Sequence, residues 1–430
     1  MGEDAGPPVT SDARRPSEAQ LDWVLATLGG ATPLREDELT ARFAPAFLQE
    51  VPADKLRAVL EQTRAALAPI TFARFEGEPT AHALVAVVRA RAGSWRVRLH
   101  VESAAPNKID GLLLQPAPDL DPAATSWSEV TDALRAAAPR VAWLAADVTD
   151  GACAKIGGAH ESTAMPMGSA FKLYILAALA SEIADGKRHW SDTLPIRADR
   201  KSLPSGDLQS EPAGKVFSLE TFAEKMISIS DNTATDHLLF ALGRERVERE
   251  VKASGHHDAS QMVPFLSTRE LFALKLAATE AERRAYVAAN VPEKRRKLAE
   301  LSKRDLSGAL AAAAEWKTPR DIDALEWSAS PEDTCRVLAA LKKRWDAPVN
   351  APLRAILSKN PGLPDTEGAF RYIGFKGGSE PGVLTTSFVL QRAKDDRWTV
   401  LAIAMADGDH AIDEAKALAA IARARAFAGK

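Results

Sequence analysis

The chain has little of several residue types, and each shortage excludes a class of protein. Only two cysteines, Cys153 and Cys335, occur in 430 residues, and neither belongs to a C-x-x-C pair. A zinc cluster of cysteines is therefore excluded and a disulfide framework is not expected, although the sequence leaves open whether these two residues bridge. No run approaches the roughly 18 apolar residues of a membrane helix, so we expect no membrane span.

The chain also lacks a large excess of basic or of acidic residues. The chain has 55 basic and 58 acidic residues, with a net charge of −3, and this balance gives no basic footprint for nucleic acid. The run Lys294 to Lys297 (KRRK) lies among glutamates and is interpreted as a solvated helix face. The hydrophobic content of 46% is typical of a soluble globular protein, and the length predicts two or three domains.

The first 16 residues are polar and proline-rich, which predicts a flexible N-terminus. They contain no apolar segment of the kind found in secretory signals. The chain as written is therefore expected to be soluble. The compartment stays open: periplasmic or secreted if a signal or lipid anchor was removed, and cytoplasmic otherwise.

Residues 17–117 predict a small α+β domain in which helices precede strands. Helical spacing occurs over 17–28, 35–43 and 52–68, and strand patterns follow at 81–90, 94–102 and 108–115. Within the second strand, alternation of Trp95 and Val97 with Arg96 and Arg98 predicts a half-buried sheet whose arginines form a solvated face.

Residues 118–125 have the composition of a linker, and residues 126–430 predict a second domain. Its strands lie at both ends, over 140–148 and 153–157 and then over 370–376, 384–392 and 398–406, with a last helix from 409 to 428. The middle is almost wholly helical. The two ends must therefore pair in one antiparallel sheet beside a helical lobe, which again is an α+β fold, with a cleft between sheet and lobe.

The segment MPMGSAFKLYILAALASEIADG, residues 165–186, stands at the centre of this second domain. A turn with Gly168 leads to Ser169 and Lys172, and an uncharged apolar run follows, which predicts a helix buried on most sides. Ser169 and Lys172 are three residues apart and share one helix face. A desolvated lysine can act as the base that activates a serine hydroxyl, but an S-x-x-K motif alone is a weak signal.

Two further motifs carry chemistry of the same kind. Ser230-Asp231-Asn232 follows a helix-like stretch and offers a second hydroxyl and a side-chain amide. Lys376-Gly377-Gly378-Ser379 lies on a predicted strand, where the lysine offers a cation for a carboxylate and the glycines allow close backbone approach.

S-x-x-K, S-D-N and K-x-G in this order resemble the serine β-lactamase and penicillin-binding-protein superfamily over residues 126–430. The resemblance implies Ser169 as the acylated nucleophile, Lys172 as its base and Ser230 as the proton shuttle. It implies Asn232, Lys376, Gly378 and Ser379 as substrate-binding residues and the backbone N–H groups of Ser169 and Ser379 as the oxyanion hole, with Asp231 structural. It implies no metal or cofactor.

The first domain resembles NTF2-like or cystatin-like folds. This domain is followed by a β-lactamase-like domain, and the order is similar to that of a two-domain group that includes the β-lactamase-like protein of clavulanic acid biosynthesis. The likeness is carried by segments such as FLQEVPADKL, KIDGLLLQPAP and VPFLSTRELFALK. This likeness implies acyl-serine chemistry and fixes no substrate.

Two departures from the superfamily pattern bear on activity. K-G-G replaces K-T-G, so Gly377 offers no hydroxyl, and carboxylate recognition is expected to be looser. The stretch after the S-D-N helix, GHHDASQMVPFLSTRE, lacks the E-x-x-L-N glutamate that activates the deacylating water in class A enzymes. His256 and His257 are adjacent and have no third partner, so we expect no metal there.

These features favour a serine hydrolase acting on an ester, an amide or a β-lactam, with slow or weak β-lactamase or esterase activity. Two alternatives stay open. One is a penicillin-binding peptidase or transpeptidase, and the other is a binding protein that holds a ligand without turnover. A small molecule is the expected partner in each case, and the sequence gives no oligomeric state.

Overall fold

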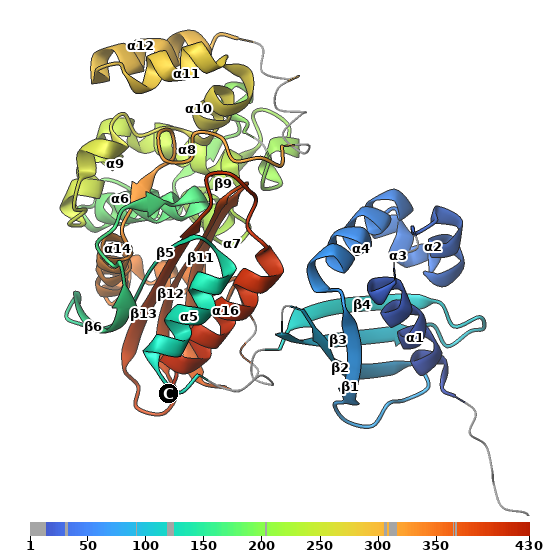
Figure 1. Cartoon of the computed structure of the whole chain (residues 1–430). Helices are drawn as coiled ribbons and strands as arrows, with labels where there is room; N and C mark the ends of the chain where they lie inside the picture. The colour runs from blue at the N-terminus through green and yellow to red at the C-terminus, as the bar shows by residue number, and fades with distance from the viewer. Residues whose placement is uncertain are drawn as a thin grey trace, which may run out of the picture. The chain divides into compact units, whose positions relative to one another are not determined.

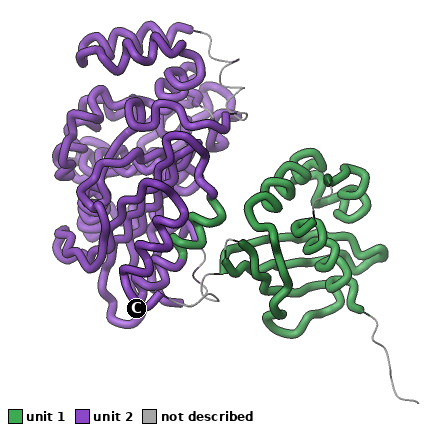
Figure 2. The backbone as a smooth tube through the Cα atoms, in the orientation of Figure 1, with its two compact units in different colours: residues 1–123, 414–422 green, residues 124–413, 423–430 purple. Residues whose placement is uncertain are grey.

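The computed structural model describes residues 14–30, 33–91, 93–117, 124–202, 204–304, 308, 316–363, 365 and 368–430. The chain divides into two compact units, one of residues 1–123 with 414–422 and one of residues 124–413 with 423–430 (Figure 2). Most of the expected flexible N-terminus, 1–16, and most of the expected linker, 118–125, lie outside the described residues.

The first unit places helices before an antiparallel sheet. Its elements are α1 (Pro16–Gly29), α2 (Glu36–Arg42), α3 (Pro45–Glu50), α4 (Ala53–Leu67), β1 (Ile70–Phe75), β2 (Ala83–Ala90), β3 (Gly93–Val101) and β4 (Ile109–Pro116). The strands pair in the order β1-β2-β3-β4. The sequence pattern does not predict β1, because most of its side chains are exposed and leave no apolar alternation.

Strand β3 follows the expected alternation with one exception. Trp95 and Val97 are buried and Arg98 is exposed, as expected. Arg96 is buried, which corrects the expectation that it lies on a solvated face. Its Nε donates to Glu76 Oε2 at 2.6 Å and its Nη2 to Oε1 at 3.0 Å, so the charge is compensated by a residue that follows the unpredicted strand β1.

The second unit contains one five-stranded antiparallel sheet, as expected from strands at both ends. Its strands are β5 (Arg140–Thr149), β6 (Ala152–Ala159), β11 (Phe370–Glu380), β12 (Val383–Arg392) and β13 (Trp398–Ala406), in the order β11-β12-β13-β5-β6. The two ends of this unit meet where β13 pairs with β5. Helix α5 (Trp127–Ala137) and the end of α16 (Glu414–Ala428) lie against one face (Figure 1), where the Trp127 ring contacts Trp143 and Phe427.

The helical lobe lies at the other face of this sheet (Figure 1). Its helices are α6 (Lys172–Ala184), α7 (Leu219–Ser228), α8 (Asn232–Leu242), α9 (Arg244–Ala253), α10 (Thr268–Phe272), α11 (Glu280–Val287), α12 (Val291–Leu301), α14 (Pro331–Trp345) and α15 (Pro352–Ser358). Two short strand pairs interrupt the predicted helical stretch: β8 (Thr193–Pro195) with β9 (Val216–Ser218), and β7 (Met165–Pro166) with β10 (Ser328–Ala329). None of the described helices has the length and apolar character needed to cross a membrane.

Helix α6 is buried on every side, as its apolar run predicts. Every side chain from Leu173 to Ala180 is inaccessible to solvent. Each buried Leu or Ile contributes about 1.5–3 kcal/mol relative to exposure, so this helix anchors the core of the second unit. The helix ends at Ala184, and Gly186 follows with φ of 70°, the left-handed backbone that glycine adopts at little cost.

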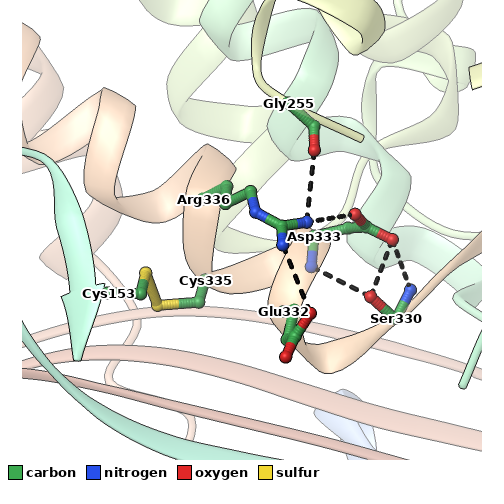
Figure 3. The surroundings of a disulfide bond; sticks show 7 residues. All are labelled: Cys153, Gly255, Ser330, Glu332, Asp333, Cys335 and Arg336. Atoms are coloured by element: carbon green, nitrogen blue, oxygen red, sulfur yellow. Dashed lines mark hydrogen bonds and ion pairs between the residues drawn. A yellow bond between two sulfur atoms is a disulfide. The ribbon is translucent and has the colours of Figure 1, made fainter. Parts of the chain in front are cut away.

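A disulfide joins Cys153 on β6 to Cys335 on α14, with their Cα atoms 6.4 Å apart (Figure 3). The sequence analysis expects no disulfide framework and leaves open whether these two residues bridge; they are 182 positions apart. The start of α14 is fixed locally. Ser330 caps the helix by accepting from Asp333 N at 3.1 Å, and Arg336 reaches the Asp333 carboxylate at 2.8 Å.

We predict that replacing both cysteines with serine lowers the free energy of unfolding by about 3–5 kcal/mol, because the cross-link closes a long loop in the unfolded chain. The unfolding midpoint should fall by roughly 10 °C. Thermal unfolding followed by circular dichroism, with and without reductant, measures this. The double variant should be insensitive to reductant, and equal midpoints for wild type in both conditions would contradict the prediction.

Candidate active site

The amine of Lys172 is buried inside the S-D-N loop. The Lys172 side chain has no exposed surface, and its Nζ lies 2.7 Å from Ser230 O, 3.0 Å from Ser230 Oγ and 2.8 Å from Asn232 Oδ1. Burial, and secondly the positive charge of Lys376, hold the pKa of Lys172 well below its ordinary value. A lowered pKa favours the neutral amine, which is the form of lysine that can accept a proton.

Ser169 lies on the 3₁₀ turn η2 (Gly168–Phe171), directly before α6. Its hydroxyl makes no hydrogen bond with another residue that the structure describes. Lys172 begins α6 three residues after Ser169, and its amine is bound to the S-D-N loop. The hydroxyl is therefore free to meet a ligand at the first turn, where backbone N–H groups and the positive end of the helix dipole favour an oxyanion.

Ser230 has a left-handed backbone, with φ of 58°. For a residue with a side chain this conformation costs about 1–2 kcal/mol, and surrounding contacts must hold it. Ser205 Oγ donates to Ser230 O at 2.7 Å, and Asn232 N donates to Ser205 O at 3.0 Å. The strained turn therefore aims the Ser230 hydroxyl at both lysines of the site.

The Asp231 carboxylate fixes two backbone segments. It accepts from Ala234 N at 2.7 Å, which caps α8, and from Asp207 N and Leu208 N at 2.8 and 2.9 Å. Gly206 makes this approach possible, because a Cβ on it would lie 2.3 Å from the carboxylate. Sequence reasoning missed Ser205 and Gly206, although the turn-forming letters PSGD were a signal for a tight loop.

Lys376 approaches the same hydroxyl from strand β11. Its Nζ lies 3.1 Å from Ser230 Oγ and 2.6 Å from Gly377 O, and its side chain is almost wholly buried. Burial lowers the pKa of Lys376 to about 7. Its charge therefore changes near neutral pH.

Glycines let β11 lie directly against the turn that carries Ser169. A Cβ on Gly378 would lie 2.2 Å from Met167 O and 2.5 Å from Ser169 N, and a Cβ on Gly168 would lie 2.9 Å from Ser379 N. Thr385 Oγ1 also donates to Met167 O at 2.7 Å. The backbones of Ser169 and Ser379 therefore stand close together, as an oxyanion hole made of their two N–H groups would require.

The stretch between α9 and α10 supplies no free carboxylate. Asp258 caps a short turn through Ser260 N at 3.2 Å. Glu270 completes a capping box with Ser267 and forms an ion pair with Arg244 at 2.7 Å. His256 is held between Asp258 N and Ser328 O, and no cluster of three or more metal-ligating side chains occurs in the described part of the chain.

Comparison with known proteins gives the family. The sequence model of the β-lactamase enzyme family matches residues 125–426, and the chain belongs to this family. A second model, described as the N-terminal part of the ORF 12 gene product, matches residues 13–106. No curated protein matches the chain. The likeness to the proteins of clavulanic acid biosynthesis stays a prediction.

Several solved structures are similar to part of the chain at low sequence identity. A β-lactamase from Sphaerobacter thermophilus is 21% identical, with a TM-score of 0.48, over 70% of this chain and 96% of its own. A β-lactamase from Chitinophaga pinensis is 16% identical, with a TM-score of 0.48, over 70% and 97%. PBP-A is 17% identical, with a TM-score of 0.43, over 69% and 96%.

We predict that Gly378→Ala slows covalent labelling of Ser169 by a serine-reactive probe about 100-fold, because the new methyl group would push β11 away from the nucleophile turn. Gly377→Ala is the matched control. Its Cβ would meet the movable end of the Phe375 ring, and labelling should stay within about threefold of wild type. Intact-mass kinetics measures both rates, and equal rates for the two variants would contradict the prediction.

Proposed function

We propose that this protein is a serine hydrolase that acts through an acyl-serine intermediate on an ester, an amide or a β-lactam. One observation carries the proposal: Lys172, three residues after Ser169, has a buried amine whose direct contacts, Ser230 and Asn232, are uncharged. Family membership supports the same reaction class.

In the proposed acylation, Ser169 Oγ attacks the substrate carbonyl carbon while its proton passes to the neutral amine of Lys172. The tetrahedral oxyanion accepts hydrogen bonds from the N–H groups of Ser169 and Ser379. The Ser230 hydroxyl then protonates the leaving group and recovers a proton from Lys172 Nζ, 3.0 Å away. The C–O bond to Ser169 forms, the bond to the leaving group breaks, and Lys172 returns to its neutral state.

Substrate binding is assigned to the same cleft edge. The Asn232 side chain would hold a substrate amide, and the backbone of β11 at Gly378 and Ser379 would pair with the substrate backbone. The Lys376 ammonium would attract a substrate carboxylate. Because Gly377 has no hydroxyl, this carboxylate loses one hydrogen bond that a threonine would give, so binding of anionic substrates is expected to be modest.

Deacylation is expected to be the slow step. Both carboxylates of the stretch after α9, Asp258 and Glu270, are engaged in caps and an ion pair and are not placed to activate water. A long-lived acyl-enzyme also fits the second candidate, a penicillin-binding peptidase or transpeptidase. The two candidates share acylation and differ in the fate of the acyl group.

We predict that a penicillin, a cephalosporin or a p-nitrophenyl ester adds one acyl group to Ser169, and that Ser169→Ala abolishes the adduct. Ser181→Ala, later on α6, is the control and should react as wild type does. Intact mass and product release are followed together. A stable adduct supports the penicillin-binding candidate, rapid lactam release a β-lactamase and ester release alone an esterase, whereas no adduct with any reagent refutes acyl-serine chemistry.

We further predict that kcat/KM for a carboxylate-bearing substrate falls about 10-fold or more, relative to a neutral ester, between about pH 6 and about pH 9. Lys376 is cationic below its pKa of about 7 and neutral above it, so its attraction for a carboxylate is lost as pH rises. Ionisation of Lys172 affects both substrates and cancels in the ratio. A ratio that does not change with pH would contradict the assignment of Lys376.

A further inference from the structure

A cluster of buried charged side chains takes no part in the proposed acylation and lies outside the site described above. Lys275, on the π-helical turn η6 (Ala273–Ala277), places its Nζ 2.7 Å from Glu326 Oε1 and also in contact with Glu380 Oε1. The exposed fractions of the three side chains are 0%, 1% and 5%. Three segments that are far apart in the sequence therefore meet at one ammonium group.

The charges of this cluster are compensated within it. The two carboxylates raise the pKa of Lys275 against the opposing effect of burial, so its side chain stays an ammonium. Burial and the neighbouring Glu326 raise the pKa of Glu380 well above its ordinary value. The Trp316 ring lies 5.5 Å from Lys275 Nζ, and Arg320 donates to the Lys275 carbonyl.

Stability alone does not explain such a cluster. Buried ion pairs often contribute no more than apolar side chains of similar volume, because desolvation offsets the attraction between the charges. They do fix geometry, since removal of one partner leaves an uncompensated charge. A π-helical turn is also rare and is found frequently at functional sites.

Both carboxylates belong to segments that flank Ser169. Glu380 follows Ser379 on β11 and lies on the same buried face of the strand as Gly378 and Lys376. That face already contacts the site twice, through Lys376 at Ser230 Oγ and through Gly378 at the Ser169 backbone. Lys275 supplies a third attachment at the end of the strand.

Glu326 acts on the other side of the nucleophile turn. It precedes Trp327, whose carbonyl accepts from Met167 N at 2.9 Å. The Trp327 ring stacks on Phe171 with centroids 3.5 Å apart and an interplanar angle of 15°. The segment that Glu326 anchors therefore contacts the η2 turn both before and after Ser169.

We propose that Lys275 is a positioning residue that sets the spacing between the Ser169 and Ser379 N–H groups by holding Glu326 and Glu380 together. This role rests on the proposed acyl-serine function. Lys275 touches no substrate, and its effect is transmitted through β11 and through the 326–329 segment. Loss of the ammonium would leave two buried carboxyl groups without a cation, and these repel each other and separate the segments once both are ionised.

The test compares Lys275→Met with Arg344→Met in the full chain. Arg344 is the matched control, because it pairs with the buried Glu250 at 2.6 Å and donates to Ala177 O near the middle of α6, eight residues after Ser169. Acylation of Ser169 by a penicillin or a p-nitrophenyl ester, measured by mass, should slow about 10-fold or more in Lys275→Met at about pH 8. Arg344→Met should acylate within about twofold of wild type, although both variants are expected to lose stability.

The pH profile separates positioning from general destabilisation. In Lys275→Met the carboxyl pair can stay buried only while it keeps its protons, so the deficit relative to wild type should grow as pH rises from about 5 to about 8. Adding Glu380→Gln removes the repulsion and should recover part of the acylation rate at the upper end of this range. A deficit that is the same at every pH and in the double variant would overturn the proposal.

Amide hydrogen exchange distinguishes this inference from the proposed function. Lys275→Met should exchange faster than Arg344→Met at Met167 and Ala170, whose amides donate to Trp327 O and Met167 O, whether or not Ser169 reacts. If wild type forms no adduct but these amides lose protection, the acyl-serine function fails and the positioning role stands. If wild type acylates and Lys275→Met keeps both wild-type rates and wild-type protection, the positioning role fails and the function stands.

Discussion

The burial of the Lys172 amine is the interaction on which the site depends. The apolar helix α6 removes the amine from water, and the direct partners that replace water are a carbonyl, a hydroxyl and a side-chain amide oxygen, none of which carries a charge. Desolvation therefore dominates, with Lys376 adding repulsion, although Asp231 and Asp236 oppose it from farther away. The same helix that anchors the core thus lowers the pKa of Lys172.

A second constraint is that two backbones must meet where Ser169 stands. A side chain on either segment would prevent the contact. Glycine, which has no side chain, stands at the contact on both: Gly168 on the η2 turn and Gly378 on β11. Ser230 gives the complementary case, because a residue with a side chain accepts a left-handed backbone there so that its hydroxyl can face two lysines. The close approach of two backbones brings the Ser169 and Ser379 N–H groups together, and the strained backbone of Ser230 directs its hydroxyl to the two lysines.

The sequence predicts the features that depend on residues close together in the chain. It does not predict contacts between segments that are far apart in the chain. The antiparallel sheet, the buried run of α6 and the alternation of Trp95 and Val97 follow from periodicity, and the structure confirms them. Arg96 could not be placed, because its partner Glu76 follows a strand with no apolar alternation. The disulfide and the contacts of Lys275 join residues 182, 51 and 105 positions apart, and no local pattern reports such pairs.

Three buried lysines of the second unit show that burial alone does not decide what a lysine does. Lys172 and Lys275 are equally inaccessible, yet the pKa of the first is lowered and that of the second is raised. The difference lies in the groups that replaced water: uncharged oxygens around Lys172 and two carboxylates around Lys275. Lys376, with a hydroxyl and a carbonyl, has a pKa of about 7. Partner charge therefore separates Lys275, whose carboxylates raise its pKa, from Lys172 and Lys376, whose uncharged contacts leave burial to lower theirs.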